Sequence, residues 1–165
     1  MIIDNTKDTL LNVASRLFSK YGFHKTSMDE IAKISRKAKG SLYYHFSSKE
    51  DLFSDVLEKE INNLKNQLQI IVNNTDLGAS QKLKNYLLKR MEILKTSTNY
   101  QETLKADFYE KFSFLDKMRN NLVIWEKENF EKIMMEGIQS GEFNVGKEKK
   151  ILPELTIMIL HGLEI

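Results

Sequence analysis

Apolar residues recur three and four positions apart along most of the chain, which is the pattern of amphipathic α-helices. One proline, Pro153, and seven glycines leave few interruptions. We therefore predict an all-α fold. The predicted helices cover residues 6–21, a short segment from 27, 38–46, 47–71, 79–96, 101–112 and 115–140, with a last helix that begins near 147 or near 153.

Turn and capping signals bound the first four helices. Gly22 suits the left-handed residue that ends a helix, and Ser27 and the run Ser47-Ser48-Lys49-Glu50 are typical N-caps. The second and third helices are short and are joined by a tight turn. This arrangement matches the helix-turn-helix, whose second helix enters the DNA major groove.

The third predicted helix has one apolar line and a larger polar and aromatic surface. At about 100° per residue, the line facing the core holds Ala38, Leu42 and Phe46. The remaining surface holds Lys39, Gly40, Ser41, Tyr43, Tyr44 and His45. A glycine inside a helix costs about 1 kcal/mol relative to alanine, and close approach of DNA to Gly40 would explain it.

Composition narrows the classes of function. Apolar residues make up 41% and charged residues 29%, as in soluble globular proteins. The absence of cysteine excludes disulfides and thiol chemistry. The first 50 residues hold nine basic and five acidic residues, whereas the rest is slightly acidic, so an anionic partner is expected for this part alone. We find no catalytic set, metal site or cofactor motif, no signal peptide and no membrane span, and we expect a cytoplasmic protein that is not an enzyme.

Residues 25–53 carry a more specific signal. They include Thr26, Ile31-Ala32, the run Lys39-Gly40-Ser41-Leu42-Tyr43-Tyr44-His45-Phe46, and Lys49-Glu50-Asp51-Leu52-Phe53. Over about residues 6–60 the chain resembles the TetR family of bacterial transcriptional regulators. The resemblance implies a three-helix DNA-binding head over residues 1–47 and a helical effector-binding and dimerisation body over residues 48–165.

The resemblance also implies roles for individual residues in the head. Thr26 or Ser27 would hold a phosphate at the start of the second helix, where free N–H groups favour anions. Lys39, Ser41 and Tyr44 would face the groove together with Gly40, and Tyr43, His45 and Lys49 would mainly contact phosphates. Double-stranded operator DNA is therefore the expected partner.

The turn before the third helix departs from the family pattern. Ser35-Arg36-Lys37 stands where the family usually has Ala-Gly-Val. Arg36 would either adopt the left-handed conformation that glycine favours or reshape the turn. Lys37 replaces an apolar residue, for which its alkyl stem would partly substitute. Either these two bases add DNA contacts, or the head is less firmly packed.

The body resembles the family only in layout. Apolar side chains that would line a small-molecule effector pocket are Met91, Phe108, Phe112, Trp125, Phe130 and Met134. Leu155, Met158 and Ile159 would lie in a homodimer interface, and His161 in the core or that interface. We expect the last family helix to be lacking, so that the apolar C-terminal segment is covered by a partner subunit or the chain dimerises poorly. The function expected is an effector-released repressor; the alternative is a helical protein-interaction module that has lost operator binding.

Overall fold

The computed structural model describes residues 6–105, 113–144, 146 and 151–162, and these contain helices and no strand. The all-α prediction is confirmed. In chain order the helices are α1 (Thr6–Tyr21), α2 (Met28–Ile34), α3 (Lys39–His45), α4 (Lys49–Val72), α5 (Ala79–Thr96), α6 (Thr98–Thr103), α8 (Ser113–Ser140) and α9 (Leu152–Gly162).

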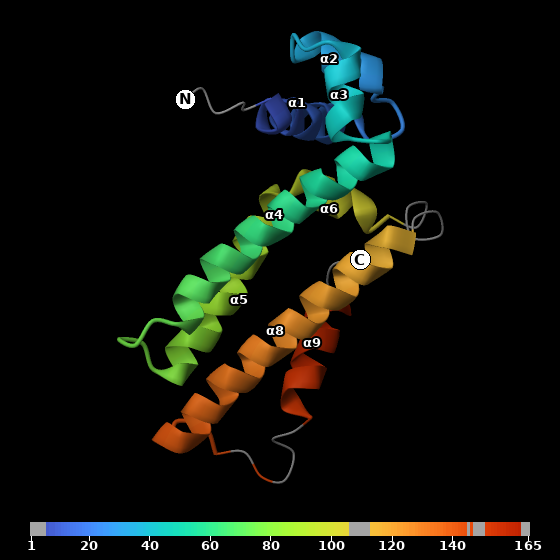
Figure 1. Ribbon diagram of the computed structural model, residues 1–165. Helices are drawn as coiled ribbons and strands as arrows, with labels where there is room; N and C mark the ends of the chain where they lie inside the picture. The colour runs from blue at the N-terminus through green and yellow to red at the C-terminus, as the bar shows by residue number, and fades with distance from the viewer. Residues whose placement is uncertain (1–5, 106–112, 145, 147–150, 163–165) are drawn as a thin grey trace.

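Helices α1, α2 and α3 gather at one end of the molecule and form what we call the head (Figure 1). The long helix α4 runs out of the head and packs along α5, which returns toward it. Helix α8 packs against α4 and α5, and α9 lies along α8. The short α6 contacts α1, α4 and α5, so it lies where the head meets the rest of the chain, the body.

The helix boundaries follow local signals in the sequence. Ser27 is the N-cap of α2 and accepts from the Glu30 N–H at 3.2 Å. Ser48 is the N-cap of α4, and its hydroxyl accepts from the Asp51 N–H at 3.0 Å. Such caps satisfy backbone donors that have no partner within the helix. Gly22 ends α1 with φ 83°, a conformation that costs glycine little.

Two details of the sequence prediction are wrong, and one aromatic residue is exposed against the period of its helix. Ala38 is the exposed N-cap of α3 and not part of its buried line, because an extended residue outside the helix does not follow the helical period. The sixth helix begins at Thr98, earlier than predicted. Tyr21 is exposed rather than packed with the apolar face of α1. The last helix begins at Leu152, so Pro153 lies in its first turn, where proline is tolerated, and causes no kink.

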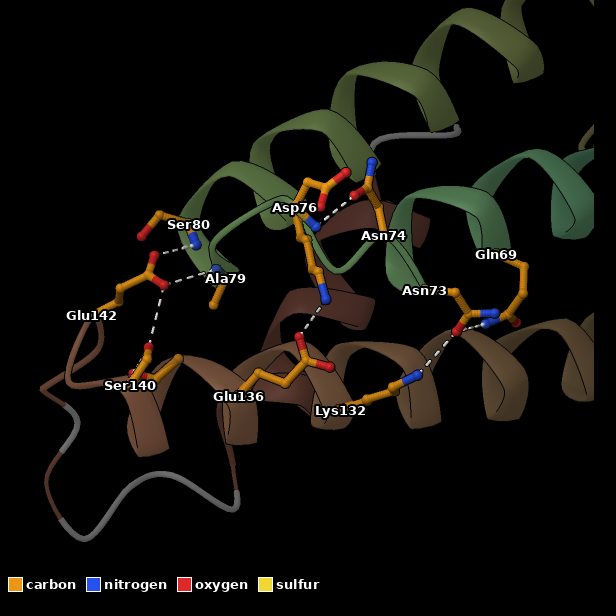
Figure 2. Close-up of polar contacts among 12 residues, drawn as sticks. Gln69, Asn73, Asn74, Asp76, Ala79, Ser80, Lys132, Glu136, Ser140 and Glu142 are labelled. Carbon is orange, nitrogen blue, oxygen red and sulfur yellow. Dashed lines mark hydrogen bonds and ion pairs between the residues drawn. The ribbon is translucent and has the colours of Figure 1, made fainter.

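The end of α8 is locked onto the start of α5 (Figure 2). Gly141 ends the helix with φ 79°, and Phe143 folds back so that its ring fills the space where a side chain on Gly137 would be. The Glu142 carboxylate accepts from the backbone N–H groups of Ala79 and Ser80, each at 3.0 Å. Hydrogen bonds from Ser80 and then Ala79 hold the pKa of Glu142 below its ordinary value.

A buried ionic cluster joins helices α5, α8 and α9 of the body. Arg90 of α5 donates to Glu126 of α8 through Nε at 2.6 Å and Nη2 at 3.2 Å. His161 of α9 lies 3.1 Å from the same carboxylate, and the Tyr86 hydroxyl reaches it at 3.5 Å. Burial acts to raise the pKa of Glu126, but the hydrogen bonds from His161 and Arg90 outweigh it and the pKa is lowered.

The described residues contain neither a helix suited to crossing a membrane nor a cluster suited to a metal ion. None of their helices combines the length and apolarity that crossing a bilayer requires. Nor do His, Asp and Glu side chains in the described ranges gather in a group of three that could bind a metal ion.

Candidate nucleic-acid interface

Helix α3 presents a largely unpacked surface to solvent. Leu42 and Phe46 fix it to the head and are fully buried. On the opposite side Tyr44 is 85% exposed, and its ring stands nearly perpendicular to that of His45, with ring centroids 5.1 Å apart. Lys39, Gly40 and Tyr43 are also exposed, whereas Ser41 and His45 are half-buried. We call Lys39, Gly40, Ser41, Tyr43, Tyr44 and His45 the α3 face.

Lys39 makes an ion pair that sequence reasoning missed. Its ammonium lies 2.7 Å from a carboxylate oxygen of Asp29 on α2 and 5.9 Å from the ring centre of Tyr43. The hydrogen bond to Asp29 raises the pKa of Lys39. Both partners are exposed, so solvent weakens the pair and an incoming phosphate can replace the carboxylate. The spacing of residues along one helix could not indicate Asp29, because it lies on another helix.

The glycine in the α3 face is not needed by the fold. A Cβ atom built on Gly40 would meet no atom within 4 Å, so no packing inside the protein excludes a side chain there. Its φ is not in the left-handed region either. The helix therefore bears the cost of a glycine without an internal reason, which favours close approach of an outside surface.

The start of α2 corrects the sequence expectation for Thr26. This side chain is 1% exposed, and its hydroxyl donates to the carbonyls of Gly22 at 2.9 Å and Leu17 at 3.3 Å. It therefore braces the loop after α1 and does not face solvent. Ser27 is exposed and remains the side-chain candidate at this position.

Lys49 is similarly engaged within the head. Its ammonium donates to the carbonyls of Phe23 at 3.0 Å and Thr26 at 3.1 Å, and it lies 4.4 Å from the centre of the Phe23 ring. These contacts tie the start of α4 to the loop between α1 and α2. A phosphate contact by Lys49 would have to replace or share them.

The unusual turn folds as an ordinary helix end. The Lys37 N–H bonds the Ala32 carbonyl and the Arg36 N–H bonds the Lys33 carbonyl, the two hydrogen bonds of a Schellman motif. Arg36 occupies the left-handed position with φ 55°, the first of the two outcomes expected for it. Lys37 is half-buried and donates to the Thr6 hydroxyl at 3.0 Å, so it helps to seat α1, and Arg36 is exposed.

The residues predicted to line an effector pocket do not gather around one cavity. Phe108 and Phe112 lie outside the described residues. Phe130 is buried core and packs against Tyr86 with ring centroids 4.7 Å apart. Trp125 and Met134 are half-buried on α8. Of the described members of this set, only Met91 lines the pocket that lies between α1, α5, α6 and α9.

The residues predicted for a dimer interface share an uncovered surface. Leu155, Met158 and Ile159 of α9 are all exposed, and Ile151 adjoins them. An exposed apolar row on one helix is typical of a surface that a partner covers. His161, from the same helix, turns instead toward Glu126.

The sequence of the head matches a known protein family. Residues 10–56 match the family described as "Bacterial regulatory proteins, tetR family". The HTH-type transcriptional regulator QacR of Staphylococcus aureus is 50% identical over 56 residues, which are 34% of this chain and 30% of that protein. The match therefore spans less than a third of that relative's length.

Two further matches extend over the whole chain. The HTH-type transcriptional regulator YhgD of Bacillus subtilis is 26% identical in an alignment that covers 100% of this chain and 83% of that protein. The crystal structure of a transcriptional regulator from Cytophaga hutchinsonii superposes with a TM-score of 0.82 at 30% identity, covering 96% of this chain and 80% of the other. The chain belongs to the TetR family of bacterial regulatory proteins, and it is a regulator rather than an enzyme.

Proposed function

We propose that this protein is a transcriptional repressor that binds a palindromic operator as a homodimer and releases it when a small-molecule effector binds the body. The observation that carries the proposal is the α3 face, which is exposed, cationic and aromatic, and holds a glycine that the fold does not need. A role on DNA would place the protein in the cytoplasm.

The chemistry of the α3 face suits duplex DNA. Lysine supplies a charge for phosphate or a donor for a guanine edge, and hydroxyls of serine and tyrosine donate to phosphates or bases. Arg36 is exposed beside the N-terminus of α3, within the part of the head that would meet the backbone. Ser27 is exposed and could contact a phosphate directly. The ammonium groups of Lys37 and Lys49 already donate hydrogen bonds within the head, so a phosphate contact by either would have to share or replace those bonds.

The proposed DNA-binding and effector-binding roles fall in different parts of the chain. We assign DNA binding to residues 1–47 and effector binding and dimerisation to residues 48–165, with α4 connecting them. A two-fold axis through the exposed row of α9 would present two heads to half-sites about 34–36 Å apart, one helical turn of DNA or a multiple of it. An effector that favours one head spacing would change operator affinity by the same factor as DNA changes effector affinity.

The proposal is tested by fluorescence anisotropy with DNA from upstream of the protein's own gene and with a scrambled duplex, each at two salt concentrations. We expect selective binding of the upstream DNA that weakens steeply as salt rises, because phosphate contacts release counterions. Sedimentation of the free protein should give the mass of a dimer. Equal and weak binding to a pool of genomic fragments and to the scrambled duplex would favour the interaction-module alternative.

Substitution of Gly40 by alanine should separate stability from function. We expect Gly40→Ala to stabilise the free protein by less than the roughly 0.5–1 kcal/mol of a helix interior, since Gly40 lies in the first turn of α3 and the methyl group meets open space. Operator affinity should fall, because the methyl group stands between α3 and the DNA. Chemical denaturation and anisotropy measure the two effects. An unchanged operator affinity would show that DNA does not approach this glycine closely.

A further inference from the structure

One pocket lies where the head meets the body. Its volume is about 810 Å³, and it is bounded by the end of α1, by α5, by α6 and the residues after it, and by Leu160 of α9. This volume is within the range of small-molecule sites. Sequence reasoning did not locate it, because its walls come from four separate segments.

Part of the pocket wall is apolar surface that the fold leaves uncovered. Met91 is 64% exposed and Tyr21 is 45% exposed, although both stand at positions that helical periodicity assigns to the interior. Leu94, Leu104 and Leu160 are half-buried in the same wall. An occupant with an apolar body would remove this surface from water, which is favourable at about 25 cal/mol per Å².

The rim of the pocket carries a surplus of positive charge. Lys20, Lys95 and Lys105 come from three different segments and line the same hollow. Among the described residues, no carboxylate pairs with any of these three lysines. The acidic residue in the lining is Glu102, whose carboxylate accepts from the Phe23 N–H at 3.2 Å. An anionic group is therefore the charge complement of this rim.

The pocket also touches the contacts that join α6 to the head. Glu102 binds the backbone just after α1, and the hydroxyls of Ser19 and Thr98 are hydrogen-bonded to each other. Ser19, Thr98 and Glu102 all line the pocket. An occupant would therefore contact the head and the body at once, and its binding energy would depend on how the two are oriented.

We propose that this junction pocket binds a small amphipathic anion, with its apolar part against Tyr21, Met91 and Leu160 and its anionic group among Lys20, Lys95 and Lys105. The proposal deepens the proposed function, on which it rests for the consequence that such a molecule changes operator affinity. Binding itself is a property of the free protein and does not depend on DNA.

The test uses three probes with the same chain length and different headgroups: dodecanoate, dodecanol and dodecylammonium. Isothermal titration calorimetry of the free protein, below the concentrations at which the probes form micelles, should show one dodecanoate per chain. Its affinity should exceed that of either other probe by about tenfold or more, a difference that one well-placed charge contact can supply. Equal affinities for all three probes, or no binding of dodecanoate, would overturn the proposal.

Two variants and a matched control test whether the probes bind in the junction pocket. Lys95→Glu should weaken dodecanoate about tenfold and narrow its advantage over dodecylammonium, whereas the neutral change Met91→Gln removes apolar wall and should weaken all three probes. Lys84→Glu makes the same charge reversal as Lys95→Glu on the exposed surface of α5 outside the pocket, and it should change nothing. Equal losses in Lys84→Glu and Lys95→Glu would refute the site. Selective dodecanoate binding by a protein that binds no operator would support the pocket and overturn the repressor proposal instead.

Discussion

Arg90→Met should destabilise the protein by about 3–5 kcal/mol, because it leaves the Glu126 carboxylate buried without its main counter-charge. Arg90 is 2% exposed and Glu126 is fully buried, so water cannot replace the lost hydrogen bonds. Urea denaturation at a fixed protein concentration measures the loss. Lys84→Met on the exposed surface of the same helix is the matched control and should cost little.

A double variant separates an uncompensated charge from lost packing. Combining Arg90→Met with Glu126→Leu removes both charges and fills the site with apolar groups, so we expect most of the stability to return. Destabilisation of the double variant equal to that of Arg90→Met would show that the single loss comes from packing. A cost below about 1 kcal/mol for Arg90→Met would show that the carboxylate finds another partner.

The pH dependence of stability has a definite sign. Because the pKa of Glu126 is lower in the folded protein than in the unfolded chain, its charge contributes stability above the ordinary carboxyl pKa of about 4.3. That contribution is lost as pH falls through the lowered pKa. The stability difference between the wild type and Glu126→Gln should therefore be largest near neutral pH and shrink on acidification. A difference that stays constant down to strongly acidic pH would contradict this.

Tyr44→Ala should reduce operator affinity about tenfold or more, since one specific base-edge or backbone contact is worth roughly 1–3 kcal/mol. Its stability should match that of the wild type, because the ring is 85% exposed and its aromatic contact is with the neighbouring His45. Anisotropy with the operator duplex measures the affinity. Ile70→Ala is the matched control, because Ile70 is 71% exposed at the end of α4 far from the head.

Salt dependence distinguishes the two contact types in the α3 face. Lys39→Ala should lower the slope of log affinity against log salt by about one, as expected for one lost phosphate contact. Tyr44→Ala should leave that slope nearly unchanged, because a neutral side chain releases no counterion. Retention of full affinity by Tyr44→Ala would show that the exposed tyrosine does not take part in operator binding.

The head could be predicted closely because its information is local. Caps such as Ser27 and Ser48 act within three residues, and Gly22 ends a helix by its own conformational freedom. The period of α3 alone separates Leu42 and Phe46 from Tyr44. The residue types of the α3 face could likewise be read from its sequence, and they are the residues on which the functional proposal depends.

The pairing of side chains from different helices could not be predicted in this way. Thr26 and Lys49 were expected to meet DNA, yet their polar atoms bond to backbone carbonyls of the loop after α1. On α5, Lys82 and Arg90 are buried. Helical periodicity identifies buried positions by their apolar residues, so it does not identify these two charged ones. Burial of each positive charge is tolerated because a carboxylate of α8 pairs with it: Glu136 pairs with Lys82, and Glu126 pairs with Arg90.

The sequence by itself thus determined the helices, their caps and the residues of the α3 face, because these depend on contacts within a few positions of the chain. Only the tertiary structure decided that Arg90 and Glu126 form a buried pair and that a pocket lies at the junction of head and body, because both features join segments far apart in the sequence and no local pattern contains them. For Arg36 the structure selected the left-handed conformation from the two outcomes that the sequence had left open.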